Sequence, residues 1–174
     1  MQKTVTIFGT SKAEPGDEVY SLAGELGQAL ASAGFAIANG GYGGAMLAAS
    51  EGASKAGGTV YGVTCTAFGR KGPNEFVTEH VSTDTLQARL AKLIDIGDAY
   101  VVLRGSTGTL LELAEVWELK NKRFLNSDIP IILLGQYWHG LLEIIASADA
   151  AAMDCITVVD SAGDAVEIIK RILT

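Results

Sequence analysis

Cysteine and histidine are scarce in this sequence, at two residues each among 174. Cys65 and Cys155 lie far apart in separate apolar segments, so neither a disulfide framework nor a CxxC metal or redox site is supported. His80 and His139 are equally isolated, and a single histidine is seldom a metal ligand. We therefore expect two buried thiols, no zinc or other metal site, and no cofactor.

Basic residues and long apolar runs are also few. Lys and Arg number 13 against 20 Asp and Glu, which gives a formal net charge of −7. Because affinity for nucleic acid depends on Lys and Arg that neutralise phosphates, we expect no nucleic-acid partner. No segment is long and apolar enough to span a bilayer, and the apolar run at 5–8 is too short for a signal peptide. We therefore expect a cytoplasmic location and no membrane partner.

Short apolar runs alternate with segments of helical periodicity along the whole chain. Leu22, Leu26 and Leu30, for example, recur at helical spacing before Gly34. Strands are expected at 4–8, 35–38, 59–63, 99–103, 129–134 and 156–159, and helices at 18–33, 45–56, 84–96, 110–121, 138–148 and the C-terminus. Strands that are apolar throughout are typical of a parallel sheet covered on both faces. The sequence predicts an α/β fold: one three-layer, doubly wound, Rossmann-like domain over residues 1–174, with a mostly parallel sheet in strand order 3-2-1-4-5-6.

Three loops that follow predicted strands are rich in glycine and hydroxyl residues. In this strand order, the loops after strands one, two and four meet at the switch point where α/β sheets bind ligands. Glycine lets backbone N–H groups approach an anion, and a helix start adds a partial positive charge. The predicted phosphate- and nucleotide-binding residues are Gly9, Thr10, Ser11, Gly40, Gly41, Gly43, Gly44, Met46, Gly105, Ser106, Thr107, Gly108 and Thr109. The alternative is that these glycines only permit tight turns between strand and helix.

None of these loops matches a common nucleotide fingerprint. The chain has no GxxxxGK[ST] motif, and Gly9-Thr-Ser-Lys12 after the first strand is not GxGxxG. Walker-type ATP hydrolysis and ordinary NAD binding are therefore disfavoured. The expected partner is a small phosphorylated nucleotide held locally.

Two of the loops, together with one cation between them, carry a family resemblance. Asn39-Gly-Gly-Tyr-Gly-Gly-Ala-Met46 and Gly105-Ser-Thr-Gly-Thr-Leu-Leu-Glu112, with Arg89 on the preceding predicted helix, resemble the GGGxxGLMG loop and the PGGxGTxxE hallmark of the Lonely Guy family. Its members are often mislabelled lysine decarboxylases. The likeness extends from the first strand to about Trp138. The family belongs to a Rossmann-like superfamily with the molybdenum cofactor carriers and the DNA-processing protein A family.

The resemblance implies a phosphoribohydrolase that cleaves the N-glycosidic bond of a nucleoside 5′-monophosphate, such as AMP or a cytokinin nucleotide. It places the phosphate on residues 106–109, gives Arg89 and Glu112 catalytic roles, and implies a homodimer or higher homo-oligomer. The chemistry is consistent with these residue types, because glycosidic cleavage builds positive charge on the sugar that a nearby carboxylate stabilises.

The sequence departs from the family pattern at four positions. The hallmark Pro is Arg104, its second Gly is Ser106, the residue before the final Glu is Leu111, and the Lys after the helix Arg is Leu90. Nucleotide binding tolerates such changes more readily than catalysis does. The alternative function is therefore a non-catalytic protein that binds a nucleotide or the molybdenum cofactor. DNA binding, as in the DNA-processing relatives, is disfavoured by the net charge.

Glu112 and Arg89 also have structural interpretations. Thr109-Leu-Leu-Glu112 fits a capping box, in which the glutamate bonds back to the start of its helix. Arg89 can equally be a solvated cation on its helix.

Four other side chains have two interpretations each. Tyr42 can stack on a base or pack over its turn, and Trp117 is expected in the core or at a subunit contact rather than at the ligand. Residues 64–75 read as a flexible surface loop that can act as a lid. Arg70 and Lys71 in this loop can close over a phosphate, but solvated positions are the favoured interpretation.

Overall fold

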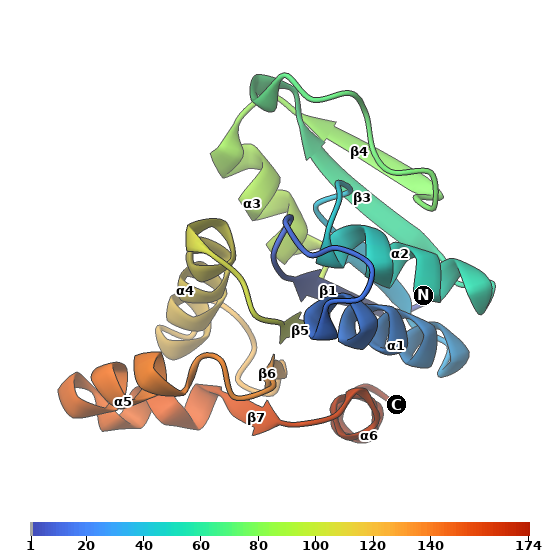
Figure 1. The fold of residues 1–174 in the computed structure, drawn as a ribbon. Coiled ribbons are helices and arrows are strands. Elements are labelled where there is room, and N and C mark those ends of the chain that lie inside the picture. Colours follow the sequence, from blue (N-terminus) through green and yellow to red (C-terminus); the bar gives the residue numbers. More distant parts are fainter. Residues whose placement is uncertain (1) are drawn as a thin grey trace.

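A seven-stranded sheet forms the centre of the computed structural model, which describes residues 2–174 (Figure 1). All neighbouring strands are parallel, in the order β4-β3-β2-β1-β5-β6-β7. The strands are β1 (Thr4–Phe8), β2 (Ala36–Asn39), β3 (Val60–Cys65), β4 (Glu79–Thr83), β5 (Ala99–Val102), β6 (Ile131–Leu134) and β7 (Thr157–Val159). The predicted order is confirmed for the six predicted strands, and it makes β1 the neighbour of both β2 and β5.

Six α-helices cover the two faces of the sheet (Figure 1). One face carries α1 (Glu18–Ser32), α2 (Ala45–Lys55) and α6 (Ala162–Leu173), and the other carries α3 (Leu86–Asp95), α4 (Thr107–Asn121) and α5 (His139–Ala148). Two 3-10 turns, η1 (Thr66–Phe68) and η2 (Ala150–Cys155), complete the elements. Within β5, Val101 packs toward the first face while Tyr100 and Val102 pack toward the second, so apolar residues are needed throughout the strand. The predicted three-layer, Rossmann-like architecture is confirmed.

Helices α1 and α2 approach each other closely through glycine. A Cβ added to Gly27 would overlap the backbone of Ala49, and one added to Gly52 would overlap the carbonyl of Gly24. Gly27 of α1 and Gly52 of α2 therefore serve the packing of these two helices. Among the residues described, no helix combines the length and the apolar composition that a membrane crossing requires.

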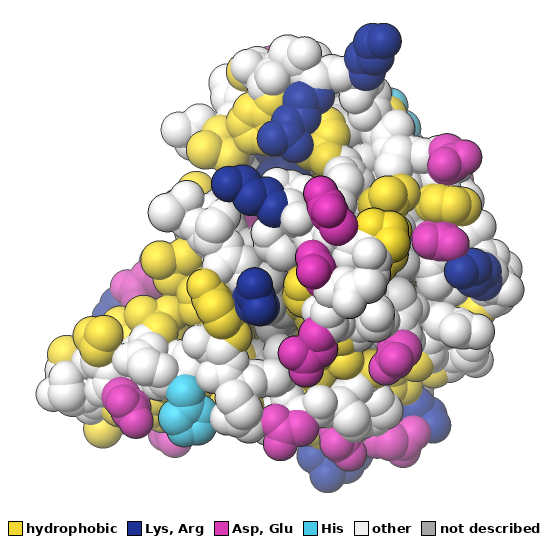
Figure 2. Space-filling view, viewed as in Figure 1, with side chains coloured by type: hydrophobic (Ala, Val, Ile, Leu, Met, Phe, Trp, Pro, Cys, Tyr) yellow, Lys and Arg dark blue, Asp and Glu magenta, His cyan; other side chains and the backbone are white. Residues whose placement is uncertain are grey.

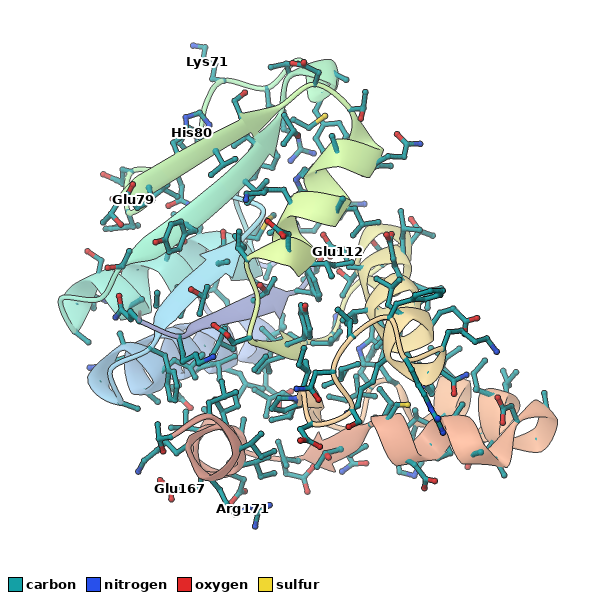
Figure 3. All side chains as sticks on the ribbon, turned by 180° about the vertical axis from the view of Figure 1, so that it is seen from behind. Lys71, Glu79, His80, Glu112, Glu167 and Arg171 are labelled. Atoms are coloured by element: carbon teal, nitrogen blue, oxygen red, sulfur yellow. The ribbon has the colours of Figure 1, made fainter. Side chains whose placement is uncertain are left out.

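The structure corrects two expectations about elements. Strand β4 was not predicted, because its side chains are exposed or half-buried at the sheet edge and form no apolar run. Figure 3 shows Glu79 and His80 on this outer strand. Helix α4 begins at Thr107, three residues earlier than predicted, because Gly108 lies inside its first turn rather than in a loop.

Candidate functional site

The loops that follow β1, β2 and β5 meet at the carboxyl edge of the sheet. Thr10 joins them, since its N–H donates to the carbonyl of Arg104 (3.1 Å) and its carbonyl accepts from the N–H of Ala45 (2.9 Å). Gly44 lies so close to this loop, with a φ of 68°, that an added Cβ would overlap the Thr10 carbonyl. The predicted convergence of the three loops is confirmed.

A cavity of about 240 Å³ opens beside these loops, and α3, α4 and η1 form its other walls. The predicted residues that line it are Gly9, Ser11, Met46, Arg89, Ser106, Gly108, Thr109 and Glu112. It is also lined by Tyr42, Phe68, Arg70, Leu86, Leu90 and Leu111. On this face of the molecule, Lys and Arg side chains border an apolar patch over η1 and α3 (Figure 2). The cavity thus combines apolar walls with basic groups and a few convergent polar groups, as ligand sites commonly do.

The other predicted binding residues do not line the cavity, and two of them, Gly43 and Thr107, are exposed to solvent. Outside the lining are Thr10, Gly40, Gly41, Gly43, Gly44, Gly105 and Thr107. Asn39 shapes the first loop, because its Oδ1 accepts from the N–H of Gly41 at 2.8 Å while Gly41 adopts a φ of 74°. Gly105 leaves space for the side chain of Thr109, which an added Cβ would overlap. These glycines permit turns and close approaches that shape the cavity wall.

Arg89 is a buried cation held in a fixed orientation. Its side chain is 8% exposed, and its Nε donates to the carbonyl of Val63 at 2.9 Å. Its Nη1 lies 3.5 Å from Oε1 of Glu112. Gly40 makes room for this guanidinium, because an added Cβ there would collide with it. The interpretation of Arg89 as a solvated helix cation is therefore wrong.

Glu112 faces Arg89 from the opposite helix, where α3 and α4 come together (Figure 3). Burial raises the pKa of the Glu112 carboxyl to about 7, even though Arg89 acts in the opposite direction. The capping-box interpretation is wrong: Ser106 is the N-cap of α4, and Thr109 lies within the helix. The pair gives the cavity a carboxyl group that exchanges its proton near neutral pH.

The first turn of α4 also faces the cavity. Ser106, Gly108 and Thr109 line it, and the Ser106 side chain accepts no capping hydrogen bond. The first N–H groups of a helix lack intrahelical acceptors and carry partial positive charge, so they favour an anion. The N-terminal end of a helix and a buried carboxyl therefore lie along one wall of the cavity.

Tyr42 and Arg70 form the wall on the side of η1. The Tyr42 hydroxyl donates to the carbonyl of Cys65 (3.2 Å) and accepts from its N–H (2.9 Å), so the ring packs over its turn and also lines the cavity. The guanidinium carbon of Arg70 lies 4.9 Å from the centre of this ring. Arg70 and Lys71 are both exposed, as the favoured interpretation predicts, and Arg70 also lines the cavity.

The degree of burial resolves three further sequence features. Trp117 belongs to the core, where it is 6% exposed and its indole N–H donates to the carbonyl of Ala152 at 2.9 Å. Leu90, at the position where the family pattern has a lysine, is 4% exposed and packs in the core under the cavity. Arg104 is exposed beside the Tyr137 ring, outside the cavity lining.

Comparison with known proteins places this geometry in a family. Residues 2–162 match the model of the SLOG cluster4 family. A cytokinin riboside 5′-monophosphate phosphoribohydrolase from Mycobacterium tuberculosis is 32% identical over 160 residues, which cover 85% of this chain and 83% of the relative.

Solved structures resemble the fold along its full length. The molybdenum cofactor binding protein from Rippkaea orientalis superposes with a TM-score of 0.82 and 26% identity, covering 100% of this chain and 99% of that one. The molybdenum cofactor carrier protein from Chlamydomonas reinhardtii, at 24% identity, shares the fold with a TM-score of 0.79 over 99% of both chains. From the match over residues 2–162, the chain belongs to the SLOG cluster4 family.

Proposed function

We propose that this protein binds a nucleoside 5′-monophosphate in the cavity and hydrolyses its N-glycosidic bond, releasing the base and ribose 5-phosphate. The observation that carries the proposal is the buried Arg89–Glu112 pair, which lies beside the first turn of α4 in one cavity. The 32% identical phosphoribohydrolase relative supports the reaction type.

The position of Glu112 along α4 indicates how the nucleotide is oriented in the cavity. The helix begins at Thr107, and Glu112 is five residues further on, a rise of about 7.5 Å along the axis. Helical side chains lean toward the N-terminus, so the carboxyl points back toward the anion-binding turn. A phosphate held by Ser106, Gly108 and Thr109 then brings the attached ribose next to Glu112.

Glu112 is suited to the chemistry of the sugar carbon. As the C1′–N bond breaks, its electron pair leaves with the base and positive charge develops on the ribose. The ionised carboxylate stabilises this charge and accepts a proton from the water that adds to C1′. The departing base takes up a proton from solvent, and Glu112 then returns its proton to solvent. A pKa of about 7 lets the same group take up and release this proton near neutral pH.

Arg89 positions the carboxylate in this scheme. Its Nε is engaged by the Val63 carbonyl and its Nη1 faces Glu112, so its remaining N–H groups can donate to ribose hydroxyls. The positive charge of Arg89 also stabilises the ionised form of Glu112, which burial alone would disfavour more strongly.

The proposal is tested by incubating the purified protein with AMP and measuring free adenine and ribose 5-phosphate in equal amounts. Arg89→Ala and Glu112→Gln should each lower the rate by about 10²–10⁴-fold. Glu118→Gln, on an exposed face of the same helix, is the matched control and should retain the activity. A panel of nucleoside monophosphates that yields no free base, from a folded protein that binds them, would reject the hydrolase.

A second candidate is a non-catalytic carrier of a phosphorylated pterin cofactor. It is favoured by the full-length likeness to the Rippkaea orientalis protein and by Ser106 and Leu111, which alter the hallmark at the cavity wall. A ligand that binds only the native state raises its stability by mass action. The carrier is supported if nucleotide or molybdenum cofactor raises the melting temperature and is recovered unchanged, and it is rejected if AMP is turned over.

A further inference from the structure

The segment between β3 and β4 is fixed at both ends to the loop that carries Tyr42. At one end, the Tyr42 hydroxyl bonds both backbone groups of Cys65. At the other, the Asn74 backbone N–H donates to the Gly41 carbonyl at 2.7 Å, and its Nδ2 donates to the Tyr42 carbonyl at 3.0 Å. These bonds fold the segment back over the cavity and place Arg70 beside the Tyr42 ring.

Arg70 is the cation of this segment that lines the cavity. Its guanidinium carbon lies 4.9 Å from the Tyr42 ring centre and 6.0 Å from that of Phe68, within the range of cation–π attraction. Within residues 2–174, the ion pairs involve other cations, and Arg89 is the cavity arginine that has a carboxylate partner. In a chain with a net charge of −7, Arg70 thus brings an uncompensated positive charge to the cavity wall.

The arrangement of the walls indicates which part of a ligand meets Arg70. The first turn of α4 is suited to the phosphate, and Glu112 with Arg89 to the sugar. The wall that remains consists of Tyr42, Phe68 and Arg70. Guanidinium is planar, stacks on aromatic rings and donates hydrogen bonds in its plane, which a lysine ammonium cannot reproduce.

We propose that Arg70 is a specificity-determining residue that stacks against the base of the bound nucleotide, with the Tyr42 ring on the opposite side of its guanidinium. This inference rests on the proposed binding of a nucleoside monophosphate in the cavity. It selects ligands that carry a flat aromatic heterocycle, such as a purine, over ligands that lack one. It also places a positive charge next to the base as the base departs with its electron pair.

The test compares AMP with ribose 5-phosphate, which has the same phosphate and sugar but no base. The affinities for both ligands are measured by calorimetry in a protein that carries Glu112→Gln, so that AMP stays intact. This background is compared with the same protein carrying Arg70→Ala, Arg70→Lys or Lys71→Ala. Lys71 is the matched control: it is the next residue, has the same charge, and extends outward at the end of the molecule (Figure 3). Arg70→Ala should weaken AMP about tenfold and leave ribose 5-phosphate unchanged. Arg70→Lys should restore little of the loss, and Lys71→Ala should bind both ligands like the background.

Four results would overturn the inference. If Arg70→Ala weakens ribose 5-phosphate as much as AMP, Arg70 contacts the phosphate instead of the base. If Arg70→Lys restores AMP affinity, charge alone accounts for the effect. If AMP affinity is the same in Arg70→Ala and Lys71→Ala, Arg70 makes no contact with the ligand. The proposed hydrolase activity is unaffected by that result, provided that the unsubstituted protein releases the base from AMP. If the Glu112→Gln background and its Arg70 variants all fail to bind AMP, both proposals are overturned.

Discussion

Replacement of Glu112 by glutamine should stabilise the protein at alkaline pH. The Glu112 carboxyl has a pKa of about 7 in the folded protein against an ordinary value of 4.5, with burial as the main cause. Below pH 4.5 the carboxyl is protonated in both states. Between pH 4.5 and 7 the unfolded chain has released a proton that the folded protein keeps, so stability falls as pH rises. Above pH 7 the loss is complete.

The two pKa values set the size of this effect. At 1.36 kcal/mol per pKa unit, the difference between them corresponds to about 3 kcal/mol of unfolding free energy. Glutamine has the shape of the neutral acid and does not titrate. The variant should therefore match the unsubstituted protein near pH 4.5 and exceed its stability by up to about 3 kcal/mol at pH 8.

Urea unfolding at pH 4.5, 6 and 8 measures this difference directly. Glu118→Gln is the control, because the Glu118 side chain is 61% exposed on the same helix and its replacement should change stability little at any of these pH values. An advantage of Glu112→Gln that is absent at pH 8, or that grows as the pH falls, would refute the assignment of a buried carboxyl with a raised pKa.

Three further predictions concern the reaction, the loop and the assembly. In the free enzyme, kcat/KM for AMP hydrolysis should rise with pH through about 7 as Glu112 ionises, and a profile that is flat from pH 5 to 9 would contradict the role of its carboxylate. Gly40→Ala should lower the unfolding free energy by about 1–3 kcal/mol and impair base release, because the new Cβ displaces Arg89; Gly72→Ala, at an open position, should do neither. Light scattering should give a solution mass twice that of the chain or more, whereas a monomer at micromolar concentration would reject the expected homo-oligomer.

The sequence was most informative where a local pattern determines the structure. Apolar runs predicted six strands, because a strand buried on both faces needs apolar residues on both. Their order follows the arrangement common to doubly wound sheets. Arg89 and Glu112 were identified from the residue types of the family hallmark. The structure adds why they meet, since α3 and α4 cover the same face of the sheet.

The features that the sequence did not reveal depend on contacts between distant segments. Strand β4 is an exposed edge strand, which produces no apolar pattern. Arg70 reaches the cavity because Cys65 and Asn74 are bonded to the Tyr42 loop, 23 and 32 residues away from Tyr42 along the chain. No periodicity in residues 64–75 encodes these bonds. Phe68 lines the cavity for the same reason.

A crystal structure of the Glu112→Gln variant with AMP tests the central claim most directly. The phosphate should lie on the N–H groups of the first turn of α4, with C1′ facing residue 112 and the base stacked on Arg70. An AMP molecule bound elsewhere, or one whose phosphate lies away from Ser106, Gly108 and Thr109 with the sugar remote from residue 112, would contradict it.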